Sequence, residues 1–104
     1  DENKIFNYLV SVHGKELFEF IDDIMSKNIT YNVSEFALKG LYMQMYNTGN
    51  QVVNAKGLNI KDVIEEDFTA NPYQLSSSEL YKYVMLYYNR ILRILSSCLK
   101  KSSV

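Results

Sequence analysis

The sequence has few of the residues that build disulfides and metal sites. Its 104 residues include one cysteine, Cys98, one histidine, His13, and no tryptophan. A single cysteine excludes an intramolecular disulfide and a cysteine-based zinc site. His13 has neither a cysteine partner nor a second histidine as a fellow ligand, so an ordinary structural role is favoured over metal binding.

Charge of one sign and long apolar runs are also missing. The chain has eleven Lys and Arg and twelve Asp and Glu, so its formal net charge is −1. The chain as a whole therefore has no general attraction to DNA or anionic membranes. No apolar run approaches the ~18 residues of a membrane span. A Gly-rich phosphate loop, a nucleophile elbow and EF-hand spacing are absent too. The sequence therefore predicts no enzymatic activity, no cofactor and no metal ion.

What the sequence does contain is helical periodicity. A composition of 47% hydrophobic and 22% charged residues is typical of a globular protein, and the length fits one domain. Apolar residues recur at steps of three and four, and no strand-like alternation competes with them. We therefore predict an all-α fold with one domain over residues 1–104: a small helical bundle of three long helices plus one short helix.

The first and last long helices have the clearest signals. The first is expected from about residue 4 to residue 26, with a break near His13-Gly14, because glycine inside a helix costs about 1 kcal/mol relative to alanine. The last is expected to begin at the capping box Ser76-Ser77-Ser78-Glu79, in which Ser76 caps the helix and Glu79 reaches back to it. Its periodicity continues to about Lys100.

The second long helix is expected from about residue 33 to residue 47, and an extension to Ala55 stays open. Asn32 is its expected N-cap, with Glu35 in capping-box register.

Two glycines and a proline mark expected ends. Gly49 and Gly57 are the expected stops of the second helix. Asn59 is expected to cap the short helix, which ends before Asn71-Pro72 because the residue preceding a proline avoids helical geometry.

The last helix combines tyrosine with positive charge. Five basic residues and no acidic residue follow Glu79. Tyrosine offers a large contact area with a polar tip and is enriched where surfaces are buried on binding, which favours a protein interface. An aromatic-rich core explains the same tyrosines equally well. The candidate partner-binding residues are Tyr83, Tyr87, Tyr88, Arg90 and Arg93.

Other charged patterns leave alternatives open. Basic residues interleaved with tyrosines also occur in nucleic-acid-binding surfaces, but five charges along a helix of this length are sparse, so direct nucleic-acid binding is disfavoured. The acidic run from Asp62 to Asp67 is interpreted as a solvated face, or else as a contact for a partner's basic patch. The expected partner is another protein, either a sister subunit of a complex or a second copy.

Three segments at matched spacing resemble one known family. The first is His13-Gly14-Lys15-Glu16-Leu17 and its continuation to Ile24. The second is Tyr31-Asn32 and the helix that follows it, up to Asn50-Gln51. The third, Tyr88-Asn89-Arg90-Ile91-Leu92-Arg93-Ile94, is similar to a Tyr-x-Arg-Leu-x-Arg-Ile stretch. Together they resemble the N-terminal helical domain of a GINS subunit of the first partner-of-Sld-five type, although Ser78 to Tyr83 replace a basic stretch usual in that family.

The resemblance implies a non-enzymatic subunit of a four-protein complex that binds the MCM helicase ring and activates it for DNA unwinding. Its helices would pack against sister subunits, and its location would be intracellular, in the nucleus. The alternative is a secreted or surface helical effector or adhesin of a microbe or parasite that binds a host protein, which applies if a signal peptide was removed before Asp1. The sequence leaves the compartment open.

Overall fold

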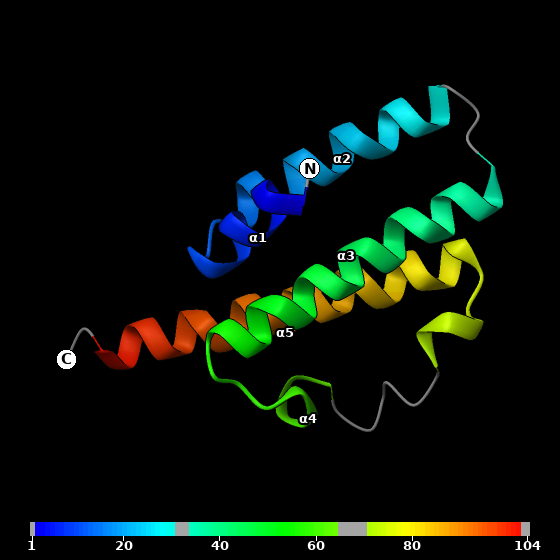
Figure 1. The fold of residues 1–104 in the computed structure, drawn as a ribbon. Coiled ribbons are helices and arrows are strands. Elements are labelled where there is room, and N and C mark those ends of the chain that lie inside the picture. Colours follow the sequence, from blue (N-terminus) through cyan, green and yellow to red (C-terminus); the bar gives the residue numbers. More distant parts are fainter. Residues whose placement is uncertain (1, 31–33, 65–70, 103–104) are drawn as a thin grey trace.

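The fold is built from helices throughout the described part of the chain. The structure, a computed structural model, describes residues 2–30, 34–64 and 71–102. Within them the elements are α1 (Glu2–Val10), α2 (Gly14–Thr30), α3 (Glu35–Ala55), α4 (Ile60–Val63), the 3₁₀ turn η1 (Pro72–Gln74) and α5 (Ser77–Ser102). No strand occurs among these residues, which confirms the predicted all-α bundle (Figure 1).

The expected break near His13-Gly14 separates α1 from α2. The N–H of His13 donates to the carbonyl of Tyr8 at 2.8 Å, and the N–H of the preceding residue donates to Leu9 at 3.1 Å. This pair of bonds is the Schellman pattern, which requires a left-handed residue just after the helix. That residue is Val12, with φ 58°. A β-branched residue is strained there, because its Cβ crowds the backbone.

The C-terminus of α3 has the same Schellman pattern, and here the left-handed residue is a glycine, which adopts this conformation without strain. The N–H of Leu58 donates to the carbonyl of Val53 at 2.9 Å, and Gly57 has φ 68°. Gly57 is thus the stop that the sequence predicts. The prediction that Gly49 also ends the helix is wrong, since α3 continues through it to Ala55.

The start of α3 differs from the prediction. Ser34 is the N-cap, and its hydroxyl accepts from the N–H of Ala37 at 3.2 Å; the expected cap, Asn32, lies outside the described residues. Glu35 links α3 to another helix. Its carboxylate accepts from the backbone N–H of Ser77 at 2.9 Å and from the Ser77 hydroxyl at 2.5 Å. The start of α3 is therefore tied to the start of α5.

The other predicted caps are confirmed. At α5, the Ser76 hydroxyl accepts from the N–H of Glu79 at 3.3 Å, and the Ser76 N–H donates to the Glu79 carboxylate at 3.3 Å. At α4, the Asn59 side chain accepts from the N–H of Lys61 at 3.0 Å. Each bond satisfies a backbone donor that the first turn of a helix leaves unpaired.

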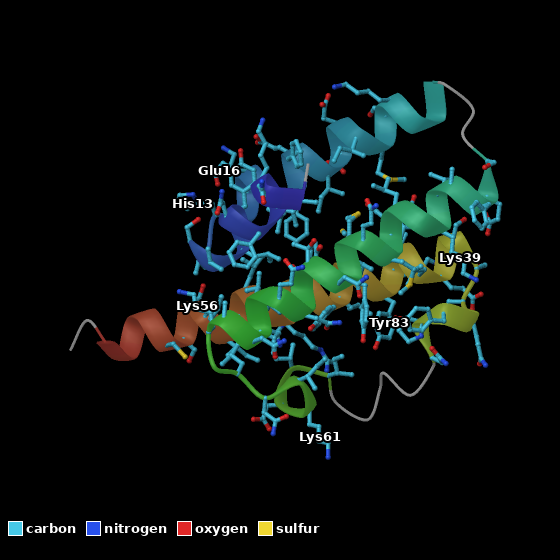
Figure 2. The ribbon with its side chains drawn as sticks, viewed as in Figure 1. His13, Glu16, Lys39, Lys56, Lys61 and Tyr83 are labelled. Carbon is cyan, nitrogen blue, oxygen red and sulfur yellow. The ribbon has the colours of Figure 1, made fainter. Side chains whose placement is uncertain are left out.

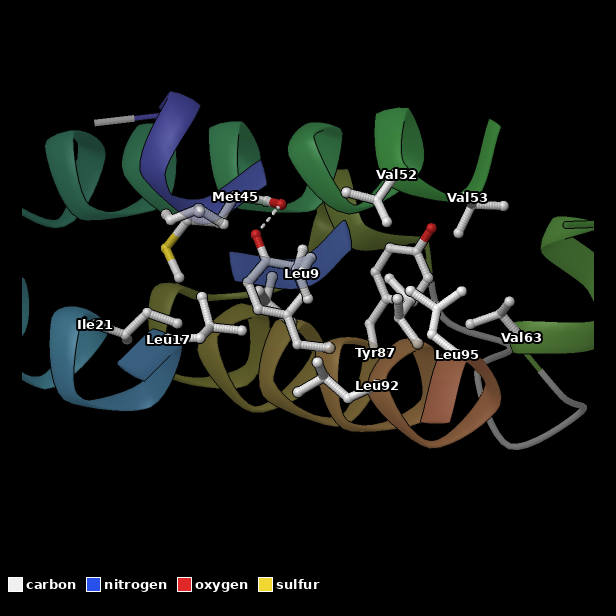
Figure 3. Packing of buried hydrophobic residues seen from close by; sticks show 14 of the residues in the cluster. Leu9, Leu17, Ile21, Met45, Val52, Val53, Val63, Tyr87, Leu92 and Leu95 are labelled. Carbon is white, nitrogen blue, oxygen red and sulfur yellow. Dashed lines mark hydrogen bonds between the residues drawn. The ribbon is translucent and has the colours of Figure 1, made fainter. Parts of the chain in front are cut away.

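The core lies where α3 and α5 run side by side, with α1 packed against α3 and α2 folded back along α1 (Figure 1). Tyr42 of α3 donates its hydroxyl to the sulfur of Met25 at 3.1 Å, which links α3 to α2. The buried apolar side chains include Ile5, Leu9, Leu17, Ile21, Val52, Val53, Leu80, Val84 and Ile91 (Figure 3). The result is an elongated molecule of 49 × 28 × 18 Å.

Candidate partner-binding site

The three candidate tyrosines lie inside the contact between α3 and α5. Tyr83, labelled in Figure 2, is 8% exposed, and Tyr87 and Tyr88 are 0% exposed. The Tyr88 hydroxyl donates to the carbonyl of Met45, drawn as a dashed line in Figure 3, and the Tyr87 hydroxyl donates to Oδ1 of Asn50 at 2.7 Å. These groups are satisfied within the chain. The partner-binding prediction is corrected for these three residues, which serve the core.

Ring packing across the two helices explains why α5 is so rich in tyrosine. The ring of Tyr46 on α3 lies 5.8 Å from the ring of Tyr83 and 5.6 Å from that of Tyr87, measured between centroids. Tyr42 and Tyr81 form a third tilted pair at 5.4 Å. Such pairs contribute about 0.5–1.5 kcal/mol each beyond the burial of their area. The tyrosines therefore hold α3 and α5 together.

Gly49 lies where α3 comes closest to these rings. A Cβ atom at this position would be 2.8 Å from Cε2 of Tyr87 and 3.1 Å from Cε1 of Tyr88. Both rings are held by the hydroxyl bonds described above, so neither moves aside easily. This close approach gives the glycine a packing role inside α3 in place of the predicted role as a stop.

The substitution Gly49→Ala is expected to lower the free energy of unfolding by about 1–2 kcal/mol, because overpacking outweighs the gain of about 1 kcal/mol in helix propensity. Gly40 of the same helix is the matched control, since a Cβ there would meet no atom within 4 Å. Gly40→Ala is expected to raise the free energy of unfolding by about 0.5–1 kcal/mol. Urea unfolding followed by circular dichroism measures both, and shifts in the same direction would contradict the packing role.

The two candidate arginines, unlike the tyrosines, lie at a surface pocket. Arg90 and Arg93 line a pocket of about 160 Å³ between α4 and α5, together with Asp62, Val63 and Ile94. Arg93 is exposed, whereas Arg90 is half-buried and its Nη1 atom is buried. Among the described residues, two guanidinium groups and one carboxylate line the pocket, so this described lining has a net positive charge.

The predicted acidic patch is only partly visible. Asp62 lies on α4 and contributes to the pocket wall. Glu65, Glu66 and Asp67 lie outside the described residues.

Comparison of the chain with protein-family models, curated proteins and solved structures found no match. The resemblance to the GINS family therefore stays a prediction from three sequence segments. The first of them forms most of the first half of α2, and the third lies within α5.

Two exposed aromatic side chains lie at one end of the bundle, and the sequence patterns do not predict their exposure. Phe36, in the first turn of α3, is 89% exposed, and Tyr73, on η1, is 65% exposed. Both lie at the end of the bundle where α3 and α5 begin, since Phe36 follows Glu35 and Tyr73 precedes the Ser77 that binds it. Periodicity groups Phe36 with the apolar stripe of its helix, so no sequence signal marks it as exposed.

The described residues contain neither a cluster of metal-ligand side chains nor a candidate membrane span. Across residues 2–30, 34–64 and 71–102, no three or more His, Cys, Asp and Glu side chains come together to hold a metal ion. Over the same residues, no helix has both the length and the apolar character needed to cross a membrane. His13, labelled in Figure 2 just before α2, is exposed, and so is Cys98 near the end of α5.

Proposed function

We propose that this chain is a non-enzymatic helical module that binds another protein. The observation that carries the proposal is the exposure of Phe36 and Tyr73 at one end of the bundle, at 89% and 65%. Most large apolar side chains in the described chain are buried or half-buried, and these two are the most exposed of the four exceptions, ahead of Leu86 at 53% and Ile60 at 38%. Aromatic residues are enriched in the buried centres of protein interfaces, where a few side chains supply most of the binding energy.

The same end of the bundle is well ordered by hydrogen bonds, which supports a binding role. The Glu35 carboxylate joins the first turns of α3 and α5 through Ser77. The Ser77 hydroxyl and then its backbone N–H hold the pKa of Glu35 below its usual value. A surface fixed in advance loses little conformational entropy on binding, so more of the contact energy appears as affinity.

The double substitution Phe36→Ala and Tyr73→Ala is expected to weaken partner binding at least tenfold, because truncation of two interface aromatics removes their desolvated contacts. The measurement is capture of partner proteins from an extract of the source cells, with each captured protein then titrated against the purified chain. Gln44→Ala, an exposed polar position on α3, is the matched control. Equal binding by wild type and the double variant, with helicity unchanged, would refute the proposed surface.

The resemblance supplies a named candidate within this function, a subunit of the GINS complex that activates the replicative helicase. Its support is the sequence of the three segments alone, which fall in α2, in α3 with the residues before it, and in α5. Co-expression with the sister subunits tests it, and a stable four-subunit complex is the expected result. If capture from an extract of host cells returns a host protein and co-expression gives no complex, the alternative of a secreted or surface effector is supported and the replication candidate is rejected.

A further inference from the structure

Three basic side chains and one exposed leucine share the outward face of α5. Lys82, Leu86, Arg90 and Arg93 follow one another at steps of four, four and three, so they form one stripe along the helix. Lys82 and Arg93 are exposed, Arg90 is half-buried, and Leu86 is 53% exposed. We call these four residues the α5 stripe. No acidic residue of the sequence follows Glu79, so α5 itself offers the stripe no opposing charge beyond its first turn.

The pocket beside α4 extends this stripe. Arg90 and Arg93 form its α5 side, and Val63 and Ile94 add apolar wall. A guanidinium group presents parallel N–H donors that match the two oxygens of a carboxylate. Asp62 on the α4 side repels a second anion. The pocket is thus suited to one carboxylate, with further negative charges placed along α5.

We propose that the α5 stripe binds an acidic segment of a partner protein. One carboxylate of the segment pairs with Arg93 at the pocket, another pairs with Lys82, and an apolar side chain between them covers Leu86. The argument for this occupant is charge complementarity: the chain as a whole has a net charge of −1, yet this face is basic. The inference rests on the proposed protein-binding function and adds the chemistry of the partner.

The spacing of the stripe sets the size of the segment. From Lys82 to Arg93, α5 rises about 16 Å at 1.5 Å per residue. An extended chain covers that length in about five residues, and a helix in about eleven. Short peptides are therefore sufficient probes.

A protein segment fits the stripe better than a nucleic acid does. Non-specific binding of single strands uses exposed aromatic rings as stacking platforms. The rings of Tyr83, Tyr87 and Tyr88 are buried against α3, so α5 cannot offer them to bases. Leu86, in turn, has no counterpart in a phosphate backbone but matches an apolar side chain.

The test titrates the full chain with a short peptide of glutamates around a central leucine, followed by fluorescence anisotropy and by NMR shifts of α5 amides. We expect saturable binding, weakened at least about tenfold by Arg93→Glu and roughly fivefold by Leu86→Ala. Lys15→Glu makes the same change in net charge at an exposed position on α2, and binding should be unchanged. A peptide with glutamine in place of glutamate should not bind.

Three results would overturn the inference. The first is equal binding by the Arg93→Glu and Lys15→Glu variants, and the second is equal binding of the glutamine peptide. The third is an oligothymidine that binds more tightly than the glutamate peptide and displaces it, which would assign the stripe to nucleic acid. The Phe36→Ala and Tyr73→Ala variant separates the two proposals. Its α5 stripe is intact. If this variant binds both the glutamate peptide and the captured partner, the aromatic surface is rejected and the acidic segment stands. If it loses the captured partner and the peptide does not bind, the acidic segment is rejected and the aromatic surface stands.

Discussion

Replacement of Tyr88 with alanine is expected to lower the free energy of unfolding by about 3–5 kcal/mol. The ring is 0% exposed, so its removal leaves a cavity between α3 and α5. The variant also loses the hydrogen bond from the Tyr88 hydroxyl to the carbonyl of Met45. Since domains of this size have a total stability of about 5–15 kcal/mol, urea unfolding should begin at far lower concentration than in the wild type.

Two further substitutions separate the ring from its hydroxyl. Tyr88→Phe keeps the ring and should lower the free energy of unfolding by about 1 kcal/mol through the lost hydrogen bond. Tyr73→Ala, at a tyrosine that is 65% exposed, should change it by no more than about 0.5 kcal/mol. If Tyr88→Ala were no more destabilising than Tyr73→Ala, the ring could not be part of the core.

The second large effect is expected in alkali, because the buried tyrosines resist ionisation. Burial, followed by the effect of the Tyr46 phenol, raises the pKa of Tyr83 from 10.0 to about 12. Burial likewise raises the pKa of Tyr87 and of Tyr88. Below pH 10 the folded and unfolded chains both keep these protons, and the full stability is present. Above it the unfolded chain loses them first, so stability falls until the pH passes the folded pKa.

Stability should therefore fall progressively between pH 10 and about 12 as Tyr83 ionises in the unfolded chain, and Tyr87 and Tyr88 add to this loss. Circular dichroism and tyrosinate absorbance should therefore change together over that interval. Tyr83→Phe removes one of the ionising groups, so its unfolding transition should move to higher pH. Ionisation of all nine tyrosines with the helices intact, and with constant stability to urea, would show that the buried rings are accessible.

Local signals in the sequence predict several helix ends, although α4 ends at Val63 and not at Asn71-Pro72 as expected. The box formed by Ser76 and Glu79, the cap at Asn59 and the stop at Gly57 all depend on residues a few positions apart. Their chemistry is complete within one turn, so no knowledge of the tertiary structure is needed. The break at His13-Gly14 was predicted for the same reason, although the strained left-handed residue is the nearby Val12.

Contacts between distant residues account for the failures. Glycine is a residue type that often ends helices. Only the contact with the rings of Tyr87 and Tyr88 on another helix explains why Gly49 lies inside α3. The two tyrosines are adjacent in sequence and therefore point about 100° apart on α5. Both are buried because α5 contacts α1 as well as α3, which gives it a wider buried face than a single neighbour would.

The candidate site was predicted in part. Arg90 and Arg93 were chosen from the sequence, and the structure brings them together at one pocket. Tyrosine could not be assigned in advance, because the same ring with a polar tip suits both an interface and a core. The exposure of Phe36 could not be predicted, because it depends on where α3 begins relative to α5. The bond between Glu35 and Ser77, which fixes that position, joins residues 42 positions apart.

The long separation between α3 and α5 also matters while the protein is being made. Met45 and its hydrogen-bond partner Tyr88 are 43 residues apart, and at about 5–20 residues per second the ribosome needs roughly 2–9 s to make the stretch between them. During that delay Tyr42 and Tyr46 on α3 have no α5 to cover them. A phenol exposed to water keeps its hydroxyl hydrated, whereas a phenylalanine would add bare apolar surface. Tyrosine at this contact therefore exposes less apolar surface on the nascent chain than phenylalanine would.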